Sequence, residues 1–140
     1  MMNWQKNILS SIGETPLVEF QRLGREFGCR IFGKVESLNP SGSIKARTAL
    51  KMIEDAEAQN LLKPESIIVE ATSGNQGIAL AMIGAVKGYK VKIVMPENMS
   101  LERRKLIQAY GAEVVLAPAG ANIQEAIEGS VSIMNRLAEE

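Results

Sequence analysis

Histidine is absent from this sequence of 140 residues, and cysteine occurs once, at Cys29. Histidine and cysteine are the usual zinc ligands, and histidine is the general base of the common hydrolase triads. A lone cysteine cannot form a disulfide bond within the chain. The composition therefore excludes a zinc site of the usual kind, a histidine-dependent triad and a disulfide framework, and we expect no metal ion.

Neither sign of charge is in excess, because Lys plus Arg and Asp plus Glu both number 16. A balanced charge argues against nucleic acid or an anionic membrane as the partner, since both favour basic patches. The sequence has no apolar run of about 20 residues, the length that crosses a bilayer, and its first residues lack the apolar core of a signal peptide. We therefore expect no nucleic-acid or membrane partner, and a cytoplasmic location.

Short apolar strands alternate with helical patterns through most of the chain. Strands are expected at residues 67–69, 91–95 and 114–116, and helices at about 46–60, 78–86, 100–110 and from 122 onward. This alternation predicts an α/β fold in which a parallel twisted sheet is flanked by helices. Loops that bind ligands are then expected at the carboxyl ends of the strands.

A loop rich in turn formers precedes a helix in the segment 36–47, which reads ESLNPSGSIKAR. Its Asn-Pro pair and its Ser-Gly-Ser run favour a tight turn. The apolar spacing that begins at Ala46 predicts a helix with Ser43 as its N-cap, so that Lys45 lies in the first turn. A cation is disfavoured there, which favours the neutral amine that imine chemistry with an aldehyde needs. The loop by itself leaves open that Lys45 is an ordinary solvated lysine.

A second polar turn joins the strand at residues 67–69 to an apolar helix near Ile78. Such a turn directs backbone N–H groups, two hydroxyls and an amide toward one point, which suits a carboxylate or a phosphate. An ordinary connection with a Ser or Asn cap explains the turn equally well. The residues of this turn are Thr72, Ser73, Gly74, Asn75 and Gln76.

Both turns belong to a series of motifs that runs along nearly the whole chain. The motifs are NIL at residues 7–9, IGETPL at 12–17, NPSGSIKAR at 39–47, TSGNQGIALA at 72–81, MPENMS at 95–100, ERRK at 102–105 and GAE at 111–113. In this series the chain resembles the fold-type II pyridoxal-phosphate enzymes, and most closely the N-terminal portion of the cysteine synthase (O-acetylserine sulfhydrylase) family. The resemblance implies a fold of the tryptophan synthase β type and pyridoxal 5'-phosphate as the cofactor.

The resemblance also implies a role for each residue of the two turns. Lys45 corresponds to the lysine that binds the cofactor aldehyde covalently and removes the substrate α-proton. Residues 72–76 correspond to the loop that grips the α-carboxylate of the amino acid substrate, and Asn75 corresponds in addition to the asparagine that hydrogen-bonds the cofactor. Gln76 stands where cysteine synthases usually have threonine, which leaves the amino acid specificity open.

The implied reaction is a β-replacement in which sulfide displaces acetate from O-acetylserine to give cysteine. A related lyase or dehydratase shares the early steps and is a second interpretation. A third is an incomplete or split module, because the family continues into a second half with a glycine-rich phosphate cup and a polar partner for the pyridine nitrogen, and this sequence matches neither. The expected partners are a small-molecule amino acid and either further copies of this chain or a complementing C-terminal half.

The resemblance finally divides the chain into two parts. Residues 1–34 correspond to a segment that packs, in the family, on the second domain, and residues 35–140 correspond to the α/β domain that binds cofactor and substrate. Without a second domain we expect exposed apolar side chains at Ile8, Leu17 and Phe20. The charged cluster at residues 102–105 is expected to be a solvated helix face.

Overall fold

The centre of the molecule is a three-stranded parallel sheet. The computed structural model, which describes residues 4–139, contains β3 (Ile67–Ala71), β4 (Lys90–Pro96) and β5 (Glu113–Ala117) in the order β3-β4-β5. Ile67 lies opposite Lys90, and Lys92 lies opposite Glu113. The predicted α/β fold with a parallel sheet flanked by helices is confirmed.

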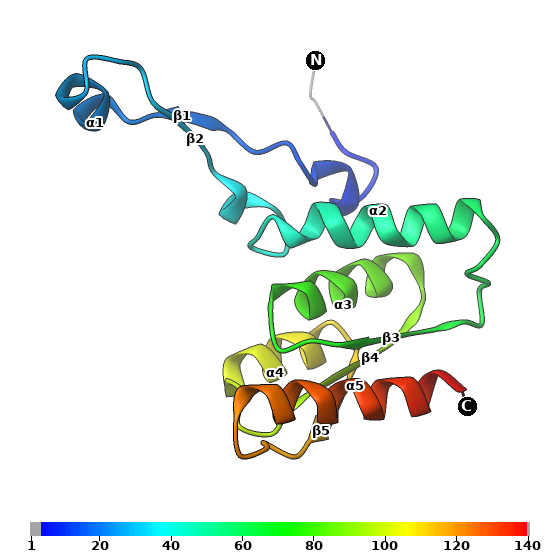
Figure 1. Ribbon diagram of the computed structural model, residues 1–140. Helices are drawn as coiled ribbons and strands as arrows, with labels where there is room; N and C mark the ends of the chain where they lie inside the picture. The colour runs from blue at the N-terminus through cyan, green and yellow to red at the C-terminus, as the bar shows by residue number, and fades with distance from the viewer. Residues whose placement is uncertain (1–3, 140) are drawn as a thin grey trace.

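Helices cover both faces of this sheet (Figure 1). α5 (Ile123–Glu139) contacts all three strands, while α3 (Asn75–Lys87) and α4 (Leu101–Ala109) pack together on the other side. α2 (Lys45–Ala58) packs on α3 as an outer layer. In the part of the chain that the structure describes, no helix is long and apolar enough to cross a membrane.

α3 is the central helix of the molecule. Its residues from Gly77 to Gly84 are all buried, because the helix lies between α2, α4 and the sheet. A helix that is covered on every side needs apolar side chains all round, and this stretch of sequence supplies them. The fully buried side chains of Ile83, Ile93 and Met95 belong to the same hydrophobic core. The start of α3 is therefore anchored to a rigid body.

α2 begins one residue later than its sequence indicates. The prediction of Ser43 as the N-cap is wrong, since Ile44 occupies that position with backbone angles of φ −57° and ψ −21°. The Ser43 hydroxyl instead accepts a hydrogen bond from the N–H of Lys45, two residues on, at 3.2 Å. A serine hydroxyl closes such a short turn as readily as it caps a helix. Lys45 is the first residue of α2, as expected for the first turn.

Ahead of α2, the chain forms a separate hairpin that we call the N-terminal arm, residues 17–34. It consists of β1 (Leu17–Glu19), α1 (Gln21–Glu26) and β2 (Phe32–Lys34), and it projects away from the body of the molecule (Figure 1). β1 and β2 pair antiparallel, so the parallel alternation predicted for the rest of the chain does not extend to the arm. Two 3-10 turns, η1 (Ile8–Ser11) and η2 (Glu36–Leu38), flank it.

The N-terminal arm and the η1 turn before it expose the apolar side chains that the sequence predicts. Leu17 is 62% exposed, Phe20 49% and Ile8, in η1, 48%. A two-stranded ribbon with one short helix has no second layer that could cover these side chains, which explains the exposure. The division of the chain into residues 1–34, a segment that packs on a second domain, and an α/β domain of residues 35–140 remains a prediction.

Candidate functional site

The two predicted turns lie at the same end of the molecule. α2 and α3 lie side by side and both begin at the end of the sheet where the strands finish (Figure 1). Lys45 opens α2, and residues 72–76 connect β3 to the first turn of α3. Parallel β–α units place helix starts beside the carboxyl ends of strands, which is where such folds bind ligands. The fold thus brings together two motifs that the sequence presents as separate.

Lys45 offers a free amine. Its side chain is exposed, and no carboxylate among the described residues forms an ion pair with it. The loop before it turns tightly at Gly42, which has a left-handed φ of 75°. Within this loop the Ser41 hydroxyl is buried and has no hydrogen-bond partner among the described residues. The segment 41–45 thus contains an exposed primary amine and, four residues before it, a buried hydroxyl that is free to bond to a ligand.

The 72–76 loop presents the start of α3. Thr72 Oγ1 accepts a hydrogen bond from the N–H of Gly74 at 3.2 Å, which closes the loop. Gly74 is the N-cap, and no side chain of residues 4–139 caps the helix. The first N–H groups of an α-helix carry partial positive charge and need external acceptors. A carboxylate or a phosphate is the natural ligand for such a start.

The side chains of this loop do not all lie in one environment. Asn75 is exposed, whereas Thr72 and Ser73 are half-buried. The Gln76 side chain contacts α2, where its Nε2 lies 3.6 Å from Sδ of Met52. Its Oε1 is buried without a hydrogen-bond partner among the described residues. Gln76 thus connects the start of α3 to α2.

Gly77 brings the loop close to the sheet. A Cβ at this position would lie 2.9 Å from Cγ2 of Thr72 and 3.1 Å from Cγ2 of Ile93, closer than carbon atoms normally approach. Glycine therefore allows α3 to start directly against the end of β3 and the middle of β4. The position of the loop depends on this close packing.

Arg103 is a residue of this site that the sequence interpretation missed. Arg103 is exposed, as predicted for a solvated helix face, but its Nη1 also donates to the backbone carbonyl of Ser73 at 3.0 Å. Arg104 also donates to a carbonyl, that of Glu97. The cluster could have been placed from topology, since the start of α4 lies near the start of α3 in a parallel sheet. The charge pattern alone contains no such information.

A network of hydrogen bonds surrounds Glu36 on the other side of the Lys45 loop. Arg47 Nε donates to Glu36 Oε2 at 2.8 Å and Arg47 Nη2 donates to Oε1 at 2.9 Å, a two-pronged ion pair. Thr15 Oγ1 and Asn39 Nδ2 donate to the same carboxylate at 2.7 and 2.9 Å. These bonds, Arg47 first, lower the pKa of Glu36 to about 2. The carboxylate is therefore ionised at any ordinary pH.

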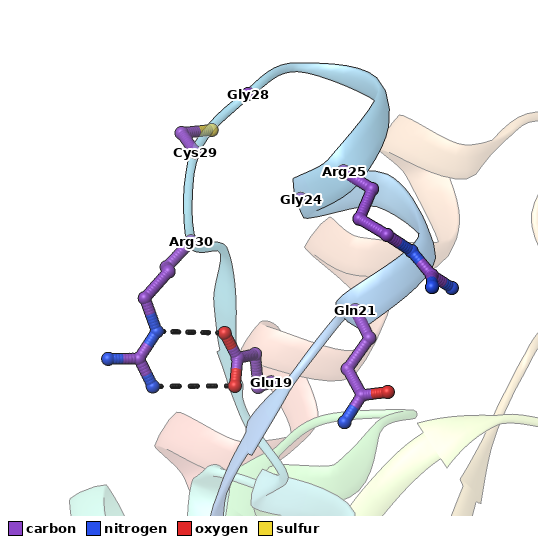
Figure 2. A pocket seen from close by; sticks show the side chains of 7 residues that line it. All are labelled: Glu19, Gln21, Gly24, Arg25, Gly28, Cys29 and Arg30. Carbon is purple, nitrogen blue, oxygen red and sulfur yellow. Dashed lines mark hydrogen bonds and ion pairs between the residues drawn. The ribbon is translucent and has the colours of Figure 1, made fainter.

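Two hollows of the surface differ in their relation to the site. One, of about 330 Å³, adjoins the loop from the side of α5 and is lined in part by Thr72, Ser73, Pro96, Met99 and Ile127. The other lies in the N-terminal arm and holds none of the predicted site residues (Figure 2). Two of its three charged side chains bind each other, since Arg30 forms a two-pronged pair with Glu19 at 2.8 and 3.4 Å. The first hollow extends the candidate site, and the second does not.

Comparison with known proteins gives a consistent result over nearly the whole chain. The family described as "Pyridoxal-phosphate dependent enzyme" matches residues 8–140. A cysteine synthase from Flavobacterium sp. is 52% identical over 135 residues, which make up 96% of this chain and 42% of that protein. The crystal structure of O-ureido-L-serine synthase superimposes with a TM-score of 0.89 at 48% identity, covering 98% of this chain and 42% of that one.

A third similar protein is a hydrogen sulfide-producing enzyme from Fusobacterium nucleatum. Its crystal structure has a TM-score of 0.89 at 44% identity and covers 99% of this chain and 44% of that one. The chain thus spans about two fifths of the length of the relatives that it matches, between 42% and 44% in these comparisons. The predicted resemblance to the N-terminal portion of the cysteine synthase family is confirmed.

Proposed function

Because this chain belongs to the family of pyridoxal-phosphate dependent enzymes, we propose that it carries the lysine and the substrate loop of a cysteine synthase-like enzyme. The observation that carries the proposal is the position of the unpaired Lys45 amine and the uncapped start of α3 at one end of the sheet. The Lys45 amine can react with an aldehyde, and the N–H groups at the start of α3 can bind a carboxylate.

The residues present fit part of the cofactor. Pyridoxal phosphate has an aldehyde, for which Lys45 supplies the amine, and a ring oxygen, for which the exposed Asn75 amide supplies a donor. The buried Ser41 hydroxyl, without a partner in the described structure, is a further donor close to Lys45 in the chain. When bound, the cofactor supplies an electron-poor ring that stabilises negative charge at the substrate α-carbon.

The protein groups then have distinct tasks. Lys45 Nζ holds the cofactor and accepts the proton of the substrate α-carbon. The N–H groups at the start of α3, together with the side chains of Thr72, Ser73 and Asn75, bind the substrate carboxylate. Arg103 holds the Ser73 carbonyl, so that the loop keeps its shape. Gln76 connects the loop to α2 through its contact with Met52.

The reaction that we propose is β-replacement on O-acetylserine. Sulfide forms the new carbon–sulfur bond, the bond from Cβ to the ester oxygen breaks, acetate leaves, and cysteine is the product. The support is the 52% identity to a cysteine synthase. A lyase that releases sulfide from cysteine is the second candidate, supported by the similarity to a hydrogen sulfide-producing enzyme. Assays with O-acetylserine plus sulfide, and with cysteine alone, separate the two candidates.

We also propose that activity needs a second polypeptide segment. The chain spans 42% of the matched cysteine synthase, and its N-terminal arm exposes apolar side chains that no described residue covers. A complementing C-terminal half would supply the grip on the cofactor phosphate for which the sequence shows no glycine-rich turn beyond residue 76. Further copies of the chain are the alternative partner.

Covalent trapping tests the assignment of the lysine. The chain is incubated with pyridoxal phosphate, reduced with borohydride, digested and examined by mass spectrometry. We expect the pyridoxyl group on Lys45 and its loss in Lys45→Ala, with Lys105→Ala as the control for an exposed lysine. Preferential modification of Lys34 or Lys51 would overturn the assignment.

A further inference from the structure

The loop that precedes Lys45, residues 36–44, is held by hydrogen bonds of Arg47 and Glu36. Neither of these side chains takes part in the reaction steps proposed above. Lys45 itself forms no ion pair with any described residue, and no side chain caps the start of α2 at its N-cap. The next charged residue along the helix, Arg47, is in contrast bound at both prongs by Glu36. Since Arg47 lies two residues after Lys45 in the same helical turn, whatever fixes Arg47 also fixes the backbone of Lys45.

The contacts of Arg47 reach the segment before the N-terminal arm. Arg47 Nη2 donates to the carbonyl of Gly13 at 2.9 Å, and a Cβ on Gly13 would lie 2.7 Å from Nη1. Gly13 has a left-handed φ of 90°, a conformation that favours glycine. The guanidinium therefore packs directly on the backbone of this segment, which a larger residue would displace.

The carboxylate of Glu36 connects the same segment to the loop. Thr15, which is 6% exposed, donates to Glu36, and so does Asn39, which is 3% exposed. Asn39 also accepts a hydrogen bond from the N–H of Gly13 at 2.9 Å. Three separate stretches of chain, around residues 13–15, 36–39 and 47, thus meet at one ion pair. A fully connected polar network of this kind specifies one geometry.

We infer that the Glu36–Arg47 pair is a clamp that positions Lys45 for its covalent bond to the cofactor, an inference that rests on the proposed function. Arg47 and Glu36 are positioning residues, since they act through the backbone of the loop. The clamp is charge-dependent, and the lowered pKa of Glu36 keeps it formed over the whole pH range in which a lysine amine reacts with an aldehyde.

The test compares two matched substitutions, one in η2 and one in α2, each of a glutamate that pairs with a basic side chain. Glu36→Gln removes the charge of the clamp while keeping the size of the side chain. Glu57→Gln removes a different ion pair, with Lys87 at 2.6 Å and a bond from Tyr89 at 2.9 Å, at the other end of α2. Each 140-residue variant is reacted with pyridoxal phosphate, and the borohydride-trapped adduct is quantified for every lysine by mass spectrometry over time.

We expect Glu36→Gln to slow the modification of Lys45 by roughly tenfold relative to Lys51 and Lys105, since small displacements of a reacting group have large effects on rate. Glu57→Gln should leave this ratio unchanged. Arg47→Lys, which keeps the charge but only one prong, should give an intermediate ratio. Hydrogen exchange of the amides at residues 41–46 gives a second measurement and should be faster in Glu36→Gln alone.

The outcomes separate this inference from the proposed function. An unchanged ratio in Glu36→Gln, or an equal loss in Glu57→Gln, overturns the clamp and leaves the assignment of Lys45 intact. A uniform distribution of adducts in the unsubstituted chain overturns both. If Glu36→Gln does not fold, as judged by circular dichroism, the Arg47→Lys variant tests the clamp instead. A modification rate of Lys45 relative to Lys51 and Lys105 that equals that of the unsubstituted chain then overturns the clamp.

Discussion

At the residue scale, the chemistry of the candidate site comes from the Lys45 amine and the backbone N–H groups at the start of α3. Some charged side chains of the body are paired, as in the bonds of Glu57 with Lys87 and Tyr89. At the candidate site, Lys45 has no carboxylate partner among the described residues, and the first N–H groups of α3 have no side-chain cap. The exposed Lys45 amine is accessible to a ligand, and the N–H groups at the start of α3 need external acceptors, which a bound anion can supply.

Substitutions in the loop should weaken the binding of the amino acid carboxylate. We expect Ser73→Ala and Asn75→Ala each to cost about 1.5–3 kcal/mol, the value of a charge-assisted hydrogen bond, and so to raise the dissociation constant by roughly ten- to a hundredfold. The cofactor absorbance of the chain in excess pyridoxal phosphate, titrated with O-acetylserine, measures this constant. Asn135→Ala, on an exposed part of α5, is the control. Equal affinity in Asn75→Ala and Asn135→Ala would contradict the role of the loop.

The Glu36–Arg47 pair should make stability depend on pH in acid. The folded-state pKa of Glu36, about 2, lies below its ordinary value of 4.5 because Arg47 bonds to the charged form. The stabilisation is therefore complete above the ordinary value and is lost as the pH falls toward the folded value. In urea unfolding, the difference in free energy between the unsubstituted chain and Glu36→Gln should shrink between about pH 5 and about pH 2. A constant difference would show that the charge of Glu36 adds nothing.

At the scale of elements, the site depends on how closely α3 approaches the sheet. Gly77 lies where the helix meets Thr72 and Ile93, and the helix behind it is buried along most of its length. The loop before the helix is thus held by a packed element, in keeping with the rule that precise sites rest on rigid supports. Arg103 of α4 adds a contact from the next helix of the fold.

Gly77→Ala should therefore destabilise the protein, although alanine favours helices. Overpacking costs roughly 1–3 kcal/mol, and alanine regains about 1 kcal/mol over glycine in a helix, so a net loss of up to about 2 kcal/mol is expected. Gly129→Ala in α5 is the control, because a Cβ there meets no atom within 4 Å and should stabilise the helix. Chemical denaturation of both variants measures the two effects. A gain in stability for Gly77→Ala would show that the approach is looser than its distances indicate.

At the scale of the whole molecule, the chain has a continuous core in its body and an arm whose apolar side chains are exposed. The sheet, α3 and the flanking helices bury a continuous set of apolar side chains. The N-terminal arm instead exposes Phe27 by 67% and Phe32 by 44%, in addition to Leu17 and Phe20. Such a surface favours association with a further chain or segment.

The isolated chain should fold but hold the cofactor weakly. The βα units supply the core, whereas the phosphate has no second glycine-rich turn in this sequence to bind it. We expect most of the visible absorbance to be lost when the chain is desalted from excess pyridoxal phosphate, and we expect no turnover of O-acetylserine. Adding a C-terminal half from a homologous cysteine synthase should raise both the cofactor absorbance retained after desalting and the turnover of O-acetylserine. Stoichiometric retention and ordinary turnover by the chain alone would contradict the split-module proposal.

The sequence by itself determined the elements that form the body and the position of Lys45 in the first turn of α2. Periodicity, turn chemistry and caps act over a few residues, so they can be recognised in the order of the chain. The motif series likewise predicted the family. Even locally there was a limit, since Ser43 closes a turn rather than capping the helix.

Only the tertiary structure decided which of these elements meet. The contact of Arg103 with Ser73 joins residues 30 positions apart, and that of Arg47 with Gly13 joins residues 34 positions apart. Neither contact leaves a periodic trace in the sequence, because each depends on how helices and loops pack after they have formed. The same holds for the antiparallel pairing of the arm, whose register depends on a partner strand and not on the strand itself.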